Sequence, residues 1–269
     1  MCVVLYYFRF HTLAEHVHTA KRYMDPISVL AAGGIRSRME SLDLLANNLA
    51  NAATSGYKVD REFYSLFTSD AAEANELGYK TVLPSIEQHW TDFSQGVLQN
   101  TGNPLDLALS GAGFFAVNGP SGPLYTRNGA FQLSGSGTLI TSDGYPVRAR
   151  GGGTITADPS MPIEVTPDGD VQQKGSTIGS LDLVKFADPM ALQKRGNNNF
   201  QVTDPTKTPS DATDIEVHQG QTESSNVNTP AAAVQLVGVL RQFDMLHRAI
   251  TLAADMQKKG IDEVARIPS

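Results

Sequence analysis

The residues best suited to chemistry are scattered and form no recognisable catalytic motif. After residue 23 the histidines are His89, His218 and His247, and none lies in a zinc-protease HExxH motif or beside an activated nucleophile. The acidic residues offer many carboxylate pairs for glycoside hydrolysis, but no feature singles out two of them. Residues 168–170 read Asp-Gly-Asp, which is too short for a calcium loop and indicates a turn. We therefore expect no catalytic residues, no cofactor and no metal site.

A glycine-rich stretch is the remaining candidate for a binding loop. Residues 111–116 match the pattern GxGxxA that holds a dinucleotide pyrophosphate at the start of a helix. The residues that follow continue as strand and turn, so no helix N-terminus is available for a phosphate. We interpret these glycines as a place where backbones pack closely at a bulge.

The first 23 residues differ from the rest of the chain. Their apolar run, residues 2–8, is far shorter than a membrane span, and no small-residue cleavage site follows it. A helical anchor, or metal binding by the histidines at positions 11, 16 and 18, is an alternative use of the segment. We interpret it as an atypical leader upstream of a natural start at Met24. It holds the single cysteine, Cys2, so an intrachain disulfide is excluded.

Composition indicates a globular protein of one large domain or two smaller ones. The chain has 269 residues, of which 41% are hydrophobic and 18% charged, with a net charge of −7. An acidic chain argues against general nucleic-acid binding, which needs a basic surface against phosphate.

The middle of the chain is expected to be β-structure. Seventeen of the 24 glycines fall between residues 96 and 196, where they suit tight turns better than helices. Asn-Gly at 128–129 and Asp-Gly at 143–144 and 168–169 are hairpin dipeptides. Short strands are predicted between them, at residues 107–110, 114–117, 130–133, 138–141 and 163–166. Their spacing favours antiparallel hairpins in a sandwich or barrel.

Long amphipathic helices are predicted at both ends. The first covers residues 26–53, with an apolar stripe of Ile35, Leu42, Leu45, Leu49 and Ala52. The second covers residues 230–264, with Thr229 as N-cap. Its stripe repeats in steps of three and four, as a heptad seam does: Leu236, Val239, Phe243, Leu246, Ile250 and Ala253. Periodicity alone leaves two alternatives, packing on the β core of one monomer or pairing with each other and with other subunits.

Three asparagines lie near the end of the first predicted helix, where they are unexpected because asparagine lowers helix propensity. They are Asn47, Asn48 and Asn51. Either they are solvated in a fraying last turn, or their amides bond across a helix–helix interface, where a polar group can fix register.

Residues 46–58 then resemble the N-terminal signature of the bacterial flagellar axial proteins, the rod and hook family: ANNLAN followed by Thr54, Gly56, Tyr57 and Lys58. Further stretches are similar to that family in the expected order, namely residues 96–115, 125–129, 139–147 and 225–228. Thr222 departs from it, because the family usually has leucine before the glutamate. Residues 241–245 look more like the proximal-rod type than the distal-rod type.

The resemblance implies a non-enzymatic structural subunit of the flagellar basal-body rod, which carries motor torque to the hook. It implies an α+β fold, in which a mainly β central domain faces outward and the terminal helices pair as a coiled coil lining a tube. The implied partners are further copies of the chain, other rod and hook proteins, and the flagellar type III export apparatus. The implied location is the periplasmic rod, reached without a cleaved signal peptide, and neither nucleic-acid binding nor membrane insertion is expected.

The expected organisation is a leader at 1–23, an N-terminal helix at 24–58, an extended linker at 59–95, a β-rich outer domain at 96–220 and a C-terminal helix at 221–269. The assembly interface is expected on both helices, at Ile35, Leu42, Leu45, Asn47, Asn48, Leu49, Asn51, Leu236, Val239, Phe243, Leu246, Ile250 and Ala253. Alternatives are a distal-rod or hook-type subunit, a secreted β-domain adhesin or binding module, and a carbohydrate-active enzyme.

Overall fold

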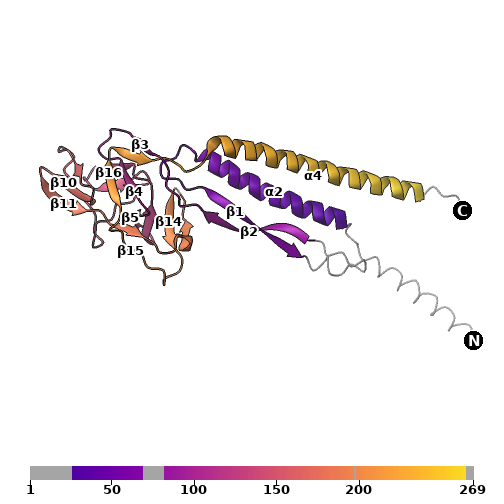
Figure 1. Ribbon diagram of the computed structural model, residues 1–269, viewed down its shortest axis with the longest axis horizontal. Coiled ribbons are helices and arrows are strands. Elements are labelled where there is room, and N and C mark those ends of the chain that lie inside the picture. The colour runs from indigo at the N-terminus through magenta and orange to yellow at the C-terminus, as the bar shows by residue number, and fades with distance from the viewer. Residues whose placement is uncertain (1–25, 69–81, 197, 265–269) are drawn as a thin grey trace, which may run out of the picture. The chain divides into compact units, whose positions relative to one another are not determined.

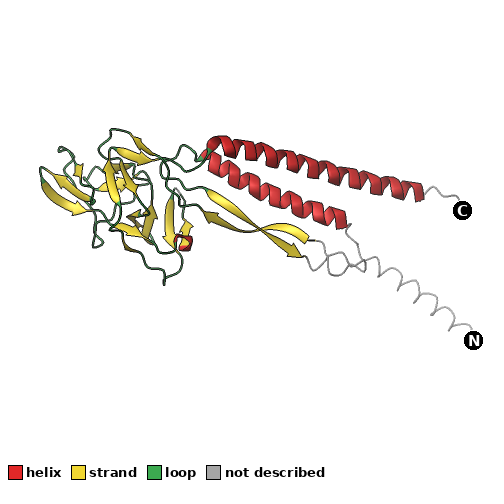
Figure 2. Ribbon diagram, viewed as in Figure 1, coloured by secondary structure: helices red, strands yellow, loops and turns green. Residues whose placement is uncertain are grey.

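The computed structural model describes residues 26–68, 82–196 and 198–264, so the expected leader lies outside the described residues. The chain divides into two compact units. One, the helical unit, comprises Met1–Leu42, Tyr64–Glu87 and Val237–Ser269, and the other, the β unit, comprises Asp43–Phe63 and Gln88–Leu236. Figure 1 traces the chain order, and Figure 2 shows helices and strands in separate colours.

Two long α-helices are present in the described residues, close to where the sequence predicts them. They are α2 (Pro26–Ala50) and α4 (Thr229–Val264). The helix α2 ends three residues earlier than predicted, and the chain after it turns through Gly56, whose φ of +69° is left-handed and favours glycine. The prediction of Thr229 as N-cap is wrong by one residue, because Asn228 Oδ1 accepts the backbone N–H of Ala231 at 3.1 Å.

The strands are short, and each pair with a defined register is antiparallel. They are β1 (Asp60–Thr68), β2 (Val82–Thr91), β3 (Leu98–Asn100), β4 (Leu107–Ser110), β5 (Phe114–Gly119), β6 (Gly122–Thr126), β7 (Phe131–Leu133), β8 (Leu139–Thr141), β9 (Glu164–Val165), β10 (Asp170–Gln173), β11 (Ser176–Ser180), β12 (Leu183–Lys185), β13 (Leu192–Lys194), β14 (Asn199–Val202), β15 (Ser210–Asp211), β16 (Glu216–Gln219) and β17 (Gln221–Glu223). The largest sheet has the order β13-β14-β6-β5-β12-β15. A short 3-10 helix, Pro189–Ala191, precedes β13.

Two apolar cores lie on either side of β5. Phe115 belongs to a core with Leu107, Leu109 and Phe131, while its neighbour Phe114 belongs to a second core with Phe200. Successive side chains of a strand point to opposite faces, so the Phe-Phe pair places one ring in each core. The first four residues of β5 are fully buried, which fixes this strand at the centre of the β unit.

Several local predictions have clear outcomes. The strand predicted at 107–110 is β4, and Asp-Gly at 143–144 and 168–169 closes a turn between antiparallel partners. Asn128-Gly129 does not close a hairpin, because β6 and β7 belong to different sheets. Glycine is needed there because a Cβ on Gly129 would collide with the carbonyl oxygen of Leu107.

The expected linker at 59–95 contains β1 and β2, which pair in a two-stranded sheet. The glycine-rich stretch at 111–116 leads into β5 and not into a helix. A Cβ on Gly113 would stand 2.6 Å from Ile215 Cδ1, so a side chain, and not the second backbone that we expected, lies nearest to this glycine. The mainly β centre with long terminal helices is thus confirmed, while coiled-coil pairing of those helices stays a prediction.

Candidate functional site

A buried cluster of three charges joins distant parts of the chain in the β unit. Lys58 Nζ donates to Glu223 Oε1 at 2.6 Å and to the carbonyl oxygen of Ser94 at 2.7 Å. Arg127 Nη1 donates to Glu223 Oε2 at 3.3 Å, and the Gly96 N–H donates to Oε1 at 2.7 Å. The side chains of Lys58 and Glu223 are completely buried, and that of Arg127 is 3% exposed. We call this cluster, with the polar residues around it, the junction.

Charge balance makes Glu223 the central residue of the junction. Burial lowers the pKa of the Lys58 ammonium, and the Glu223 carboxylate opposes that shift. Burial also lowers the pKa of Arg127, again opposed by Glu223. Arg127 lies over the ring of Phe114, 5.4 Å from its centroid, which adds a cation–π contact. Two cations thus share one carboxylate away from water.

The asparagines of the first helix tie the helix end to β1. Asn48 Nδ2 donates to the Asp60 carbonyl oxygen at 2.8 Å, and Asn48 Oδ1 accepts the Asp60 N–H at 3.0 Å. The hydroxyl of Tyr57 lies 2.9 Å from both Asn48 Oδ1 and Asn47 Oδ1. Asn51 Nδ2 donates to the Asn47 carbonyl oxygen at 2.9 Å, within the last turn.

These bonds hold the asparagine amides within one chain: Asn48 is bonded to β1 and to Tyr57, while Asn47 is exposed. Asn48 is 2% exposed, since the turn and the start of β1 close over it. Burial raises the pKa of the Tyr57 hydroxyl, which keeps it a neutral donor to these amides. Whether Asn47, Asn48 and Asn51 also contact a neighbouring copy stays a prediction.

Asn226 binds the segment before α4 to the junction by hydrogen bonds. Its Oδ1 accepts the Val59 N–H at 2.8 Å, and its Nδ2 donates to the Asp92 carbonyl oxygen at 2.8 Å. From the β13–β14 side, Lys194 Nζ donates to the Lys58 carbonyl oxygen at 2.6 Å and to Asp60 Oδ2 at 2.7 Å. The junction therefore binds the chain that follows α2 to the chain that precedes α4.

The predicted seam residues of the helices lie on partly buried faces. On α4, all six are intermediate in exposure: Leu236, Val239, Phe243, Leu246, Ile250 and Ala253. On α2 the predicted apolar residues are intermediate too: Ile35, Leu42, Leu45 and Leu49. Within the helical unit, the two helices approach each other at Gly34, where a Cβ would lie 3.3 Å from Leu246 Cδ1. From Ala32 onward, however, the most buried residues of α2 are polar: Ser37, Ser41 and Asn48.

Sequence reasoning missed the charges of the junction. Lys58 ends the N-terminal signature, Arg127 lies within residues 125–129, and Glu223 shortly precedes residues 225–228. A lysine, an arginine and a glutamate, each within or beside a motif of apolar and small residues, were the available signal. Their pairing could not be read from local spacing, because Lys58 and Glu223 are 165 positions apart.

The β unit contains the C-terminal end of α2 and the N-terminal end of α4. The structure therefore has the form of a scaffold for two long terminal helices. Comparison with known proteins agrees with that class. Residues 108–173 match the family model "Flagellar hook protein FlgE/F/G D1 domain", and residues 218–263 match "Flagellar basal body rod FlgEFG protein C-terminal".

Full-length relatives lead to the same family. The chain is 34% identical over 229 residues to the flagellar basal-body rod protein FlgF of Caulobacter vibrioides, covering 84% of this chain and 92% of the relative. It is 30% identical over 260 residues to the flagellar basal-body rod protein FlgG of Buchnera aphidicola subsp. Schizaphis graminum, covering 88% of this chain and 98% of the relative. The chain therefore belongs to the flagellar basal-body rod protein family, and its role is structural, in motility.

The alternatives of an adhesin or a carbohydrate-active enzyme receive no support from these relatives. In the described part of the chain, no group of three His, Cys, Asp or Glu side chains could hold a metal ion. None of the described helices has the length and hydropathy needed to cross a membrane.

Proposed function

We propose that the protein is a rod subunit that assembles with further copies, and with other flagellar axial proteins, through its terminal helices. The assembled shaft transmits torque from the motor to the hook. The observation that carries this proposal is the apolar surface of α4. Among the described residues, six of the nine large apolar side chains that are exposed lie on this one helix. An isolated soluble protein rarely leaves so much apolar surface in water.

The junction suits a part that bears load. In this proposal the chain segments at 57–60, after α2, and at 223–228, before α4, bear load next to each helix. Both segments are held there by buried ion pairs and by asparagine hydrogen bonds to the backbone. Self-association that does not close on itself builds a helical shaft of such units.

We further propose export in an unfolded state through the flagellar type III apparatus, without a cleaved signal peptide, to the periplasmic rod. The absence of cysteine from residues 24–269 favours this route, because a free thiol could cross-link subunits in an oxidising compartment. Within the rod, residues 241–245 favour the proximal type.

Leu246→Asp tests assembly through the helices, because Leu246 is the seam residue that approaches Gly34. We expect the variant to be absent from purified basal bodies and the cells to be non-motile, with the β unit still folded. Met190→Asp is the matched control, since Met190 is an exposed apolar residue of the β unit. Incorporation of Leu246→Asp at the wild-type level would refute the proposal.

A further inference from the structure

Methionine carries all the sulfur of residues 24–269. This part of the chain contains six methionines and no cysteine. Met190, Met245 and Met256 are 64%, 62% and 66% exposed, and Met39 is 52% exposed. Met161, by contrast, is only partly exposed. Because a thioether at the surface is open to oxidants, the four exposed methionines are the candidate sites of oxidation.

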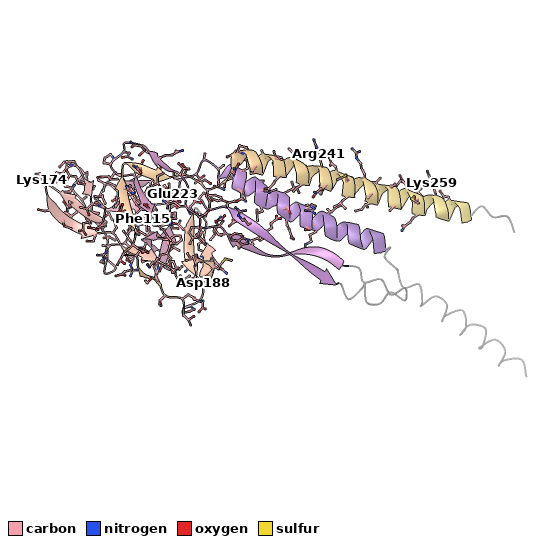
Figure 3. The ribbon with its side chains drawn as sticks, in the orientation of Figure 1. Phe115, Lys174, Asp188, Glu223, Arg241 and Lys259 are labelled. Carbon is pink, nitrogen blue, oxygen red and sulfur yellow. The ribbon has the colours of Figure 1, made fainter. Side chains whose placement is uncertain are left out.

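Two of these methionines share one face of α4. Met245 and Met256 are eleven residues apart, so they lie within roughly 20° of each other around the helix and about 16.5 Å apart along it. Both belong to the six exposed apolar residues of α4 on which the proposed assembly rests. Arg241 lies one turn from Met245 and Lys259 one turn from Met256, and Figure 3 labels these two charged residues. Arg241 and Lys259 are exposed as well, so each thioether has a neighbour that reaches water.

We propose that Met245 and Met256 form a reversible oxidation site, at which a peroxide converts the free subunit to a methionine sulfoxide form that does not assemble. The inference rests on the proposed assembly through the terminal helices and adds a chemical control of it. Sulfoxide formation replaces a flexible apolar side chain with a polar one. Burying the new oxygen against an apolar partner without a hydrogen bond is unfavourable, so an oxidised α4 should keep this face in water.

Each modification is a two-electron step that hydrogen peroxide balances alone. The Sδ lone pair attacks one oxygen atom of the peroxide, an S–O bond forms, and the O–O bond breaks. The proton on the transferred oxygen passes to the departing oxygen, which leaves as water. Sulfur is oxidised and the peroxide is reduced. Methionine sulfoxide reductases reverse the change, with one enzyme for each epimer of the sulfoxide.

Met190 is a matched comparison, because its exposure is similar but its place in the fold is different. It lies in the short 3-10 helix Pro189–Ala191 of the β unit. Similar exposure predicts a similar rate of oxidation at Met190, Met245 and Met256. Only the two methionines of α4 lie on the helix through which assembly is proposed. The chemical step and its consequence for assembly can therefore be measured separately.

Two double variants of the full-length chain separate the sites. The α4 variant carries Met245→Leu and Met256→Leu, and the control variant carries Met39→Leu and Met190→Leu, so that each keeps two exposed methionines. Leucine preserves the apolar volume in both. All chains, wild type included, carry Cys2→Ser, which leaves methionine as the only oxidisable sulfur. Each chain is treated with hydrogen peroxide, which is then removed. Peptide mass spectrometry locates the sulfoxides, and sedimentation velocity measures self-association.

We expect Met245 and Met256 to be oxidised faster than Met161, since they are more exposed. The oxidised wild type should associate at least about tenfold more weakly than the untreated chain. The oxidised control variant should weaken to the same extent, whereas the oxidised α4 variant should associate as it does untreated. Treatment of the oxidised wild type with both sulfoxide reductases should restore association.

Three results would overturn the inference. One is oxidation of Met245 and Met256 no faster than that of Met161. Another is unchanged association of a wild-type chain in which both sulfoxides are present. The third is loss of association by the oxidised α4 variant, because the effect would then come from other sites. If the untreated chain itself stays monomeric at all concentrations, the proposed assembly fails as well, which distinguishes that failure from these three.

Discussion

Replacing Glu223 with glutamine is expected to destabilise the β unit more than removing either of its cationic partners. Glutamine keeps the shape of the side chain but removes the one carboxylate that Lys58 and Arg127 share. Two cations would then remain buried without a counter-charge. Lys58→Met removes one cation and leaves the Arg127–Glu223 pair in place, so its cost should be smaller.

The expected magnitudes follow from the burial of these side chains. Removing one partner of a buried ion pair costs about 3–5 kcal/mol of unfolding free energy. In Glu223→Gln, Lys58 can escape the buried charge by losing its proton. At pH 7 that costs about 5 kcal/mol, from a reference pKa of about 10.4 and about 1.4 kcal/mol per pKa unit. For Lys58→Met we expect about 1–3 kcal/mol, from hydrogen bonds lost at Glu223 and Ser94.

The pH dependence of the Glu223→Gln variant has a definite sign. Without the carboxylate, the folded-state pKa of Lys58 falls further below its unfolded value, so between the two the unfolded chain binds more protons. Stability must then rise with pH. The destabilisation should shrink by up to about 2.7 kcal/mol between pH 7 and pH 9, at about 1.4 kcal/mol per unit.

Urea unfolding followed by the fluorescence of Trp90, the one tryptophan, measures these differences in the β unit. Lys207→Met is the matched control, because the Lys207–Asp188 pair is 46% exposed on both sides. Its cost should stay below about 1 kcal/mol. The reasoning is refuted if Glu223→Gln costs less than Lys58→Met, or if its cost is the same at pH 7 and pH 9.

Three further outcomes are expected. Gly56→Ala should cost more than about 1 kcal/mol in the same urea assay, because φ is +69° and a Cβ would stand 2.4 Å from the Arg127 backbone; an unchanged midpoint contradicts this. Burial acts to raise the pKa of Asp92, but its hydrogen bonds with Ser94 and Arg61 outweigh burial and lower it. The stability gained from Asp92 over Asp92→Asn should therefore be present at pH 7 and lost as pH falls below about 4, which urea unfolding at pH 3 checks. We also expect α4 beyond residue 237 to fray in the dilute monomer and to fold fully only on assembly, so its amides should exchange faster than those of β5; equal protection by mass spectrometry would contradict this.

Local signals predicted the elements of the fold, and long-range contacts explain what they missed. The step pattern from Leu236 to Ala253 identified the half-buried face of α4, because helical periodicity is a local property. The dipeptide Asn128-Gly129 predicted a hairpin that does not form, because a long-range contact and not a local turn requires the glycine. A glycine demanded by the distant Leu107 carbonyl looks the same in sequence as a glycine demanded by a turn. The asparagines were recognised as unusual, but Asn48 donates to the backbone of β1 and Asn47 accepts from Tyr57 in the turn before it, and both partners lie beyond the helix pattern.

The polar chemistry of the junction has a physical reason beyond stability. Apolar contacts alone tolerate sliding, whereas a buried Lys58 must find Glu223, and Asn226 must find the backbone of Val59 and Asp92. These directional bonds end only a few residues before Asn228, which caps α4. A slip of one residue there would turn the start of α4 by about 100°. A subunit that assembles through its terminal helices, as proposed above, needs the start of α4 held in one rotational setting, and buried charges and amides hold it more strictly than apolar packing can.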